Sequence, residues 1–114
     1  MPAVPSTARV AAASLDQTVG DWVGNTDRIR AAILAARAAG ARLLVLPEMC
    51  VPGYSLGDRL LMDGTIERSR AAVDALLADT AGIVVVVGLP VRHREVLYNA
   101  VAVLADGVVH GVVP

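Results

Sequence analysis

The run Ile-Val-Val-Val-Val at residues 83–87, followed by Gly88, most narrowly restricts the folds open to this chain. β-branched residues favour strands, and a strand that is apolar at every position needs cover on both faces. Residues 42–46 (Arg-Leu-Leu-Val-Leu) are nearly as apolar, and Pro47 ends that run. Because such strands are typical of a parallel sheet packed against helices, the sequence predicts an α/β fold.

A helix is predicted between the first strand (residues 9–14) and residues 42–46. Asn25 suits the N-cap position after a polar loop at residues 15–24. Ile29 and Ile33 then recur at helical spacing, and Gly40 follows as a C′ residue. A second amphipathic helix is predicted at residues 65–78, preceded by a single helical turn at residues 58–62.

The last third of the chain predicts a β-hairpin. Residues 98–104 and 108–113 are rich in strand-forming residues, and they flank Asp106-Gly107, a strong hairpin signal. Pro90 is expected to close the strand at residues 83–88. The predicted order is βαβαβ plus a β-hairpin, with the helices on one face of a mainly parallel sheet. Since no third helix follows, we expect residues 1–114 to be part of a larger domain.

Composition excludes several functional classes. The chain has 114 residues, a net charge of −1 and 3% aromatic residues, which argues against nucleic-acid binding. All ten basic residues are arginines, so a Walker A loop and Schiff-base chemistry are excluded within this chain. One cysteine cannot form an internal disulfide. We find no signal peptide at the N-terminus and no membrane span, and we expect a cytoplasmic protein.

Glu48 is the main candidate for chemistry. It follows the strand at residues 42–46, and ligands of α/β sheets bind beyond the carboxyl ends of the strands. Burial between Pro47 and Met49 would raise its pKa toward the range of a general base. Gly88, at the end of the neighbouring strand, would leave room beside it. The residues alone leave open that Glu48 caps a helix or faces water, and that Gly88 merely ends its strand.

The other reactive side chains carry weaker signals. Cys50 is a candidate nucleophile or a small buried apolar residue, and the lack of a nearby cation favours the second interpretation. His93 lies in a charged turn and His110 in a hairpin strand, so their spacing with Cys50 predicts no metal site. No glycine pattern of a dinucleotide fold is present. We therefore expect neither a cofactor nor a metal in this chain.

Several motifs follow one another along the chain: Leu-Pro-Glu-Met-Cys-Val-Pro-Gly-Tyr (46–54), Gly-Tyr-Ser-Leu-Gly-Asp-Arg-Leu-Leu (53–61), Gly-Leu-Pro (88–90), Pro-Val-Arg-His (90–93), Leu-Tyr-Asn-Ala (97–100) and Gly-Val-Val-His-Gly-Val-Val-Pro (107–114). Together they resemble the nitrilase (carbon–nitrogen hydrolase) superfamily. Within it, the chain looks most like the glutaminase domain of glutamine-dependent NAD synthetases, from Arg9 onward. The resemblance implies the amino-terminal portion of an αββα sandwich.

The resemblance also implies a catalytic role for Glu48. Enzymes of this family use a Glu, a Lys and a Cys, and Glu48 matches the Glu, the general base that activates the thiol. The family's Lys follows the segment matched by residues 112–114, and its nucleophilic Cys comes later, so Cys50 does not match it. We expect a partial domain that ends before the Lys and Cys and is inactive alone. Glu48 is expected to be mostly buried, near Gly88 and residues 98–99.

For the full-length protein, the resemblance implies glutamine or another amide as substrate. ATP and deamido-NAD would bind a synthetase domain outside this chain, and the full-length family implies a homo-oligomer. No nucleic acid or membrane is implied as a partner. Two alternatives stay open: a truncated stand-alone amidase or nitrilase, and a non-catalytic fragment or pseudoenzyme.

Overall fold

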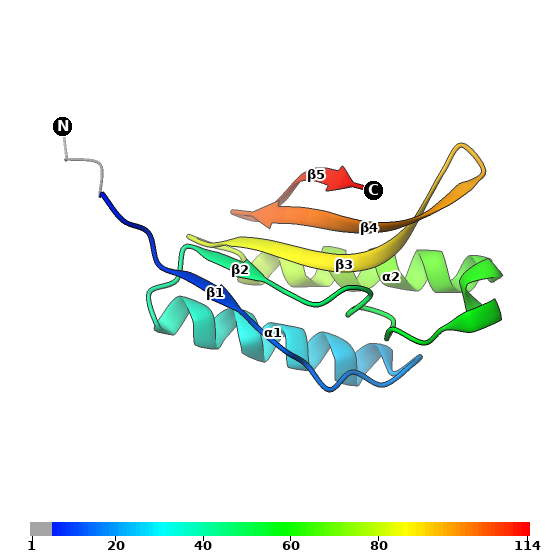
Figure 1. Cartoon of the computed structure of the whole chain (residues 1–114), viewed down its shortest axis with the longest axis horizontal. Coiled ribbons are helices and arrows are strands. Elements are labelled where there is room, and N and C mark those ends of the chain that lie inside the picture. The colour runs from blue at the N-terminus through cyan, green and yellow to red at the C-terminus, as the bar shows by residue number, and fades with distance from the viewer. Residues whose placement is uncertain (1–5) are drawn as a thin grey trace.

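A computed structural model describes residues 6–114, apart from the side chain of Asp63. Residues 1–5, part of the N-terminus in which no signal peptide is predicted, lie outside the described residues. Its element order is βαβαβ plus a β-hairpin, as predicted (Figure 1). Short 3₁₀ turns at Gly57–Leu61 and Leu77–Asp79 flank the second helix. The strands and helices are β1 (Val10–Ala12), α1 (Trp22–Ala38), β2 (Leu43–Val45), α2 (Asp63–Leu76), β3 (Val84–His93), β4 (Val96–Ala105) and β5 (Val108–Val113).

The five strands form one sheet in the order β1-β2-β3-β4-β5. The pairs β1–β2 and β2–β3 are parallel, whereas β3–β4 and β4–β5 are antiparallel. The sheet is therefore evenly mixed rather than mainly parallel. The additional antiparallel pair arises because Arg94 and Glu95 both adopt positive φ, 49° and 66°, and close a tight hairpin between β3 and β4. The second hairpin turns at Asp106-Gly107, as predicted.

β3 does not end at Pro90, contrary to the sequence prediction, but continues to His93. The N–H of Val84 donates to the Arg42 carbonyl of the β2 side, and the Val86 carbonyl accepts from the N–H of Leu46. The backbone groups of even-numbered residues in β3 therefore point toward β2. The missing N–H of Pro90 faces that same side, where β2 has already ended, so the proline removes no ladder hydrogen bond.

Helix α1 begins three residues before the predicted N-cap, Asn25. Asp21 caps it instead, because its Oδ1 accepts a hydrogen bond of 3.0 Å from the N–H of Gly24. Asn25 lies inside the first turn and is fully buried. At the other end the prediction is confirmed, since Gly40 follows the helix with φ of +82°.

Both helices pack on the same face of the sheet and enclose a single core (Figure 1). Alternate strand residues point into this core, as the two-residue period of a strand requires. The opposite face carries no helix among residues 6–114, and its side chains remain wholly or partly exposed. The core includes Ile29, Ile33, Leu44, Val73, Leu76, Val85, Val87, Ala102 and Leu104. The open face carries Val10, Val45, Val84, Val86, Val101 and Val103.

Candidate active site

Glu48 lies just beyond the carboxyl end of β2, where the turn at residues 48–52 begins. The backbone of this turn crosses β3 at Gly88. A Cβ atom placed on Gly88 would lie 2.6 Å from the backbone N of Met49 and 2.6 Å from the carbonyl O of Pro47. Because real Cβ contacts are never that short, only glycine permits the crossing. Gly88 thus leaves the room beside Glu48 that the sequence interpretation assigned to it.

Backbone hydrogen bonds fix the turn over β3. The N–H of Val51 donates to the Gly88 carbonyl at 3.2 Å, and the N–H of Gly53 donates to the Met49 carbonyl at 3.0 Å. Met49 itself has φ of +51°, a left-handed conformation that non-glycine residues seldom adopt. The residue next to Glu48 is therefore held in an unusual conformation by the contacts around it.

Asn99 contacts the Glu48 carboxylate directly. It lies on β4 opposite Pro90 of β3, and its Nδ2 donates a hydrogen bond to Oε1 of Glu48. Glu48 is nevertheless exposed, so the expectation that it is mostly buried is wrong for this chain. The reason is that Glu48 and Asn99 lie on the open face of the sheet. The proximity of Glu48 to Gly88 and Asn99 follows the expectation, but the desolvation on which its role was argued is absent here.

Three polar side chains behind the turn were missed by the sequence analysis. Asn25 and Gln17 donate hydrogen bonds to carbonyl groups of the turn, and Arg28 donates to both of their amide oxygens. They come from α1 and the loop before it, far from Glu48 in sequence. Their only signal was a cluster of polar residues around the start of a helix, which a capping role explained equally well.

Cys50 is a core residue. It is 1% exposed, packs in the apolar cluster under the helices, and its Sγ lies 3.8 Å from the Gly88 carbonyl. Burial raises the pKa of the thiol to about 11. The interpretation as a small buried apolar residue is therefore favoured over that of a nucleophile. His93 is exposed at the end of β3, and His110 on β5 has its Nε2 3.2 Å from the Ala105 carbonyl.

The raised thiol pKa predicts a loss of stability at high pH. Between pH 9 and pH 11 the unfolded chain releases the Cys50 proton while the folded chain keeps it, so the free energy of unfolding falls as pH rises through this window. A shift from 9.0 to about 11 corresponds to about 2–3 kcal/mol. Urea unfolding at pH 8, 9, 10 and 11 measures this slope. Cys50→Ala should unfold with a flatter profile, and an equal slope in both proteins would contradict the assignment.

No group of three or more His, Cys, Asp or Glu side chains within the described part of the chain is arranged to hold a metal ion. No helix of residues 6–114 is long and apolar enough to cross a membrane.

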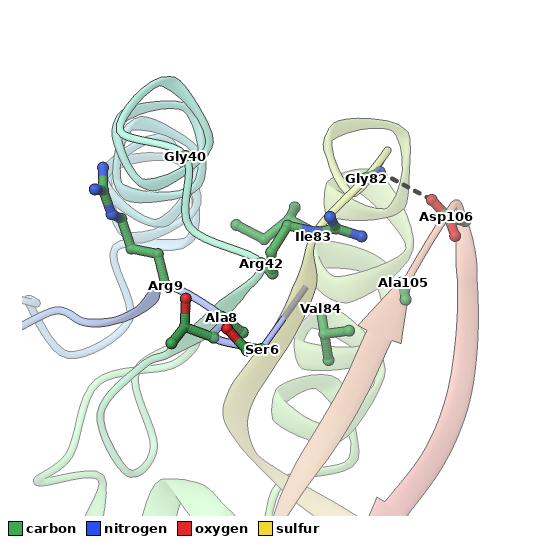
Figure 2. Close-up of a pocket in the computed structure, with 11 residues that line it drawn as sticks. Ser6, Ala8, Arg9, Gly40, Arg42, Gly82, Ile83, Val84, Ala105 and Asp106 are labelled. Carbon is green, nitrogen blue, oxygen red and sulfur yellow. Dashed lines mark hydrogen bonds between the residues drawn. The ribbon is translucent and has the colours of Figure 1, made fainter. Parts of the chain in front are cut away.

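A groove of about 790 Å³ lies at the opposite end of the sheet from Glu48. Figure 2 shows the side chains that line it. Residues that precede β1, β2 and β3 line it, together with the turn between β4 and β5. Arg9 points toward the end of α1 and donates to the Ala39 carbonyl, while Asp106 accepts from the N–H of Gly82. Both charged side chains are exposed and cap neighbouring backbone. The strand-end rule therefore favours the Glu48 end as the functional one.

Comparison with known proteins agrees with this geometry. Residues 9–109 match the model of the carbon–nitrogen hydrolase family. The solved structure of a glutamine-dependent NAD(+) synthetase from Cytophaga hutchinsonii superposes with a TM-score of 0.91 at 36% identity, over 94% of this chain and 18% of that one. An amidase from Nesterenkonia sp. shares the fold, with a TM-score of 0.78 at 23% identity, over 92% of this chain and 41% of that one.

The chain therefore belongs to the carbon–nitrogen hydrolase family. Its similarity is to the glutamine-dependent NAD(+) synthetases in particular. The Mycobacterium tuberculosis protein of that name is 39% identical over 108 residues, which cover 93% of this chain and 16% of the relative. The chain thus spans about a sixth of the length of this relative and is homologous to part of its glutaminase domain.

Proposed function

We propose that this chain is the amino-terminal part of a glutamine-hydrolysing domain that supplies ammonia for NAD synthesis, with Glu48 as its general base. The observation that carries the proposal is the Glu48 site on a chain similar to NAD(+) synthetases: the glutamate follows β2, its turn crosses Gly88, and Asn99 holds one carboxylate oxygen. Position and sequence similarity support the same assignment independently.

The geometry suits a base that acts on a group outside this chain. Asn99 donates to Oε1 of Glu48, which orients the carboxylate and leaves Oε2 to accept a proton. By family resemblance, that proton comes from a cysteine thiol, whose sulfur attacks the amide carbon of glutamine. The carbon–nitrogen bond breaks, the proton passes to the departing nitrogen, and ammonia leaves. Water then attacks the thioester: its oxygen completes the carboxyl group of glutamate, the carbon–sulfur bond breaks, and one proton of the water restores the thiol.

The open sheet face fits the same proposal. Glu48 and Asn99 lie on the face that carries exposed valines, so a second layer packed there would bury the carboxylate together with the apolar surface. ATP and deamido-NAD would bind elsewhere in the full-length protein, which we propose to be a cytoplasmic homo-oligomer.

Two measurements of ammonia release test the proposed function. The isolated chain should release none from glutamine, because it has no lysine and its one cysteine is buried with a raised pKa. A hybrid in which this chain replaces the matched 108 residues of the M. tuberculosis relative should release ammonia from glutamine and far less from acetamide. Equal rates with the two amides would instead favour a general amidase. Turnover by the isolated chain that Cys50→Ser abolishes would overturn the assignment.

A further inference from the structure

We infer that Asn25 is a positioning residue for Glu48, acting through the turn at residues 48–52. The inference rests on the proposed role of Glu48 as the base. Asn25 is 0% exposed although it carries a polar amide, and it lies inside α1 rather than at its cap. A buried amide is costly unless its donors and acceptor are satisfied, so its partners indicate what it does.

The amide of Asn25 joins two loops. Its Nδ2 donates to the Thr18 carbonyl at 2.8 Å and to the Val51 carbonyl at 3.1 Å, and its Oδ1 accepts from the N–H of Thr18 at 2.9 Å. Gln17 adds a parallel contact, because its Nε2 donates to the Cys50 carbonyl at 2.8 Å. Two consecutive carbonyl groups of the turn that begins at Glu48 are therefore held by side-chain amides.

Arg28 determines which way these amides face. Its guanidinium donates to Oδ1 of Asn25 at 2.7 Å and to Oε1 of Gln17 at 2.8 Å. Because a guanidinium can only donate, both amide oxygens must face Arg28, and both NH₂ groups must then face the turn. The orientation of both side-chain amides is thus fixed by the hydrogen bonds from Arg28 and not by packing alone.

The two sides of Val51 connect this network to the site. Its carbonyl accepts from Asn25 of α1, and its N–H donates to the Gly88 carbonyl of β3. Asn25 therefore helps to hold the turn against β3 at Gly88, where the backbone of Glu48 crosses the strand. The Glu48 side chain then reaches Asn99, which lies opposite Pro90 two residues further along β3. Without the amide donor the turn can lift from Gly88, and the Glu48–Asn99 hydrogen bond is lost.

Asn25→Asp in the full chain tests the inference. The aspartate keeps an acceptor for the N–H of Thr18 and for Arg28, but it cannot donate to the carbonyl groups of Thr18 and Val51. The readout is the pH titration of the Asn99 side-chain amide in ¹⁵N NMR, which senses ionisation of Glu48 through their hydrogen bond. We expect the titration amplitude of the Asn99 amide to fall by about half or more in Asn25→Asp. Gln17→Ala is a milder variant that can be used if Asn25→Asp does not fold, and we expect a smaller fall in it.

Ser69→Ala is the matched control. Ser69 is also 0% exposed and hydrogen-bonded, but its Oγ donates to the Thr65 carbonyl of its own helix, α2, at 2.8 Å and not to the turn. Its loss should lower stability and leave the Asn99 titration unchanged. A full titration amplitude in folded Asn25→Asp and Gln17→Ala would overturn the inference. The NMR titration involves no substrate, so its result does not depend on whether the proposed function is correct. Failure of the proposed function would be seen separately, as glutamine hydrolysis that survives Glu48→Gln.

Discussion

Replacing Glu48 by Gln in the hybrid enzyme should lower kcat for ammonia release from glutamine by about 10²–10⁴-fold, the usual contribution of a general base. The glutamine side chain is nearly isosteric, and its amide oxygen can still accept from Asn99, so the turn should keep its position. What it loses is the ability to take a proton. The expected change is therefore in kcat, with KM largely retained.

Glu67→Gln provides the control for this substitution. Glu67 is an exposed carboxylate on the surface of α2, and the same chemical change there removes one negative charge without touching the site. Its kcat should stay within about twofold of the parent hybrid, in line with ordinary surface substitutions. Hydrolysis that survives Glu48→Gln at the parent rate would show that Glu48 is not the base.

Gly88→Ala should destabilise the chain by about 3 kcal/mol, at the upper end of the cost of overpacking a core. The new methyl group would lie 2.6 Å from backbone atoms of Pro47 and Met49. Backbone atoms cannot relieve such a contact by a change of rotamer, as the end of a flexible side chain can. The turn must then lift from β3, which also breaks the contact between Val51 and Gly88. Urea unfolding of the purified variant at pH 7 measures the loss.

Gly111→Ala is the matched control, because it makes the same change in another strand. Nothing lies within 4 Å of a Cβ placed on Gly111, and its φ is not in the left-handed region. Its free energy of unfolding should stay within about 0.5 kcal/mol of the parent. Equal losses at the two glycines would mean that the cost is one of strand propensity and not of the crossing at Gly88.

Elements with strong local patterns were predicted correctly. Residues 84–87 of the apolar run lie in β3, the central strand of the sheet, and Asp106-Gly107 forms the turn of a hairpin. Both were predictable because strand burial and turn type depend on residues that are neighbours in the sequence. The boundary at Pro90 was wrong because a proline stops a strand only where its N–H is needed. Whether the N–H is needed at Pro90 depends on where the neighbouring strand β2 ends, and this cannot be predicted from the residues around Pro90.

The candidate site also has features that local sequence predicts and features that depend on contacts between distant segments. The position of Glu48 followed from the rule for strand ends, and the space at Gly88 from the absence of a side chain. The role of Asn25 could not be predicted, because its partners Thr18 and Val51 come together only when two loops pack against one helix. The exposure of Glu48 was missed for another reason: burial on the open face depends on a layer that residues 6–114 do not supply.

The most direct test of the central claim is the rate of ammonia release from glutamine by the hybrid with Glu48 intact. The account predicts a kcat within about tenfold of the parent M. tuberculosis enzyme, a difference of about 1.4 kcal/mol in activation free energy. NAD formation from added ammonia serves as the internal control for folding and assembly. A hybrid that makes NAD from free ammonia at the parent rate, yet releases none from glutamine, would contradict the account.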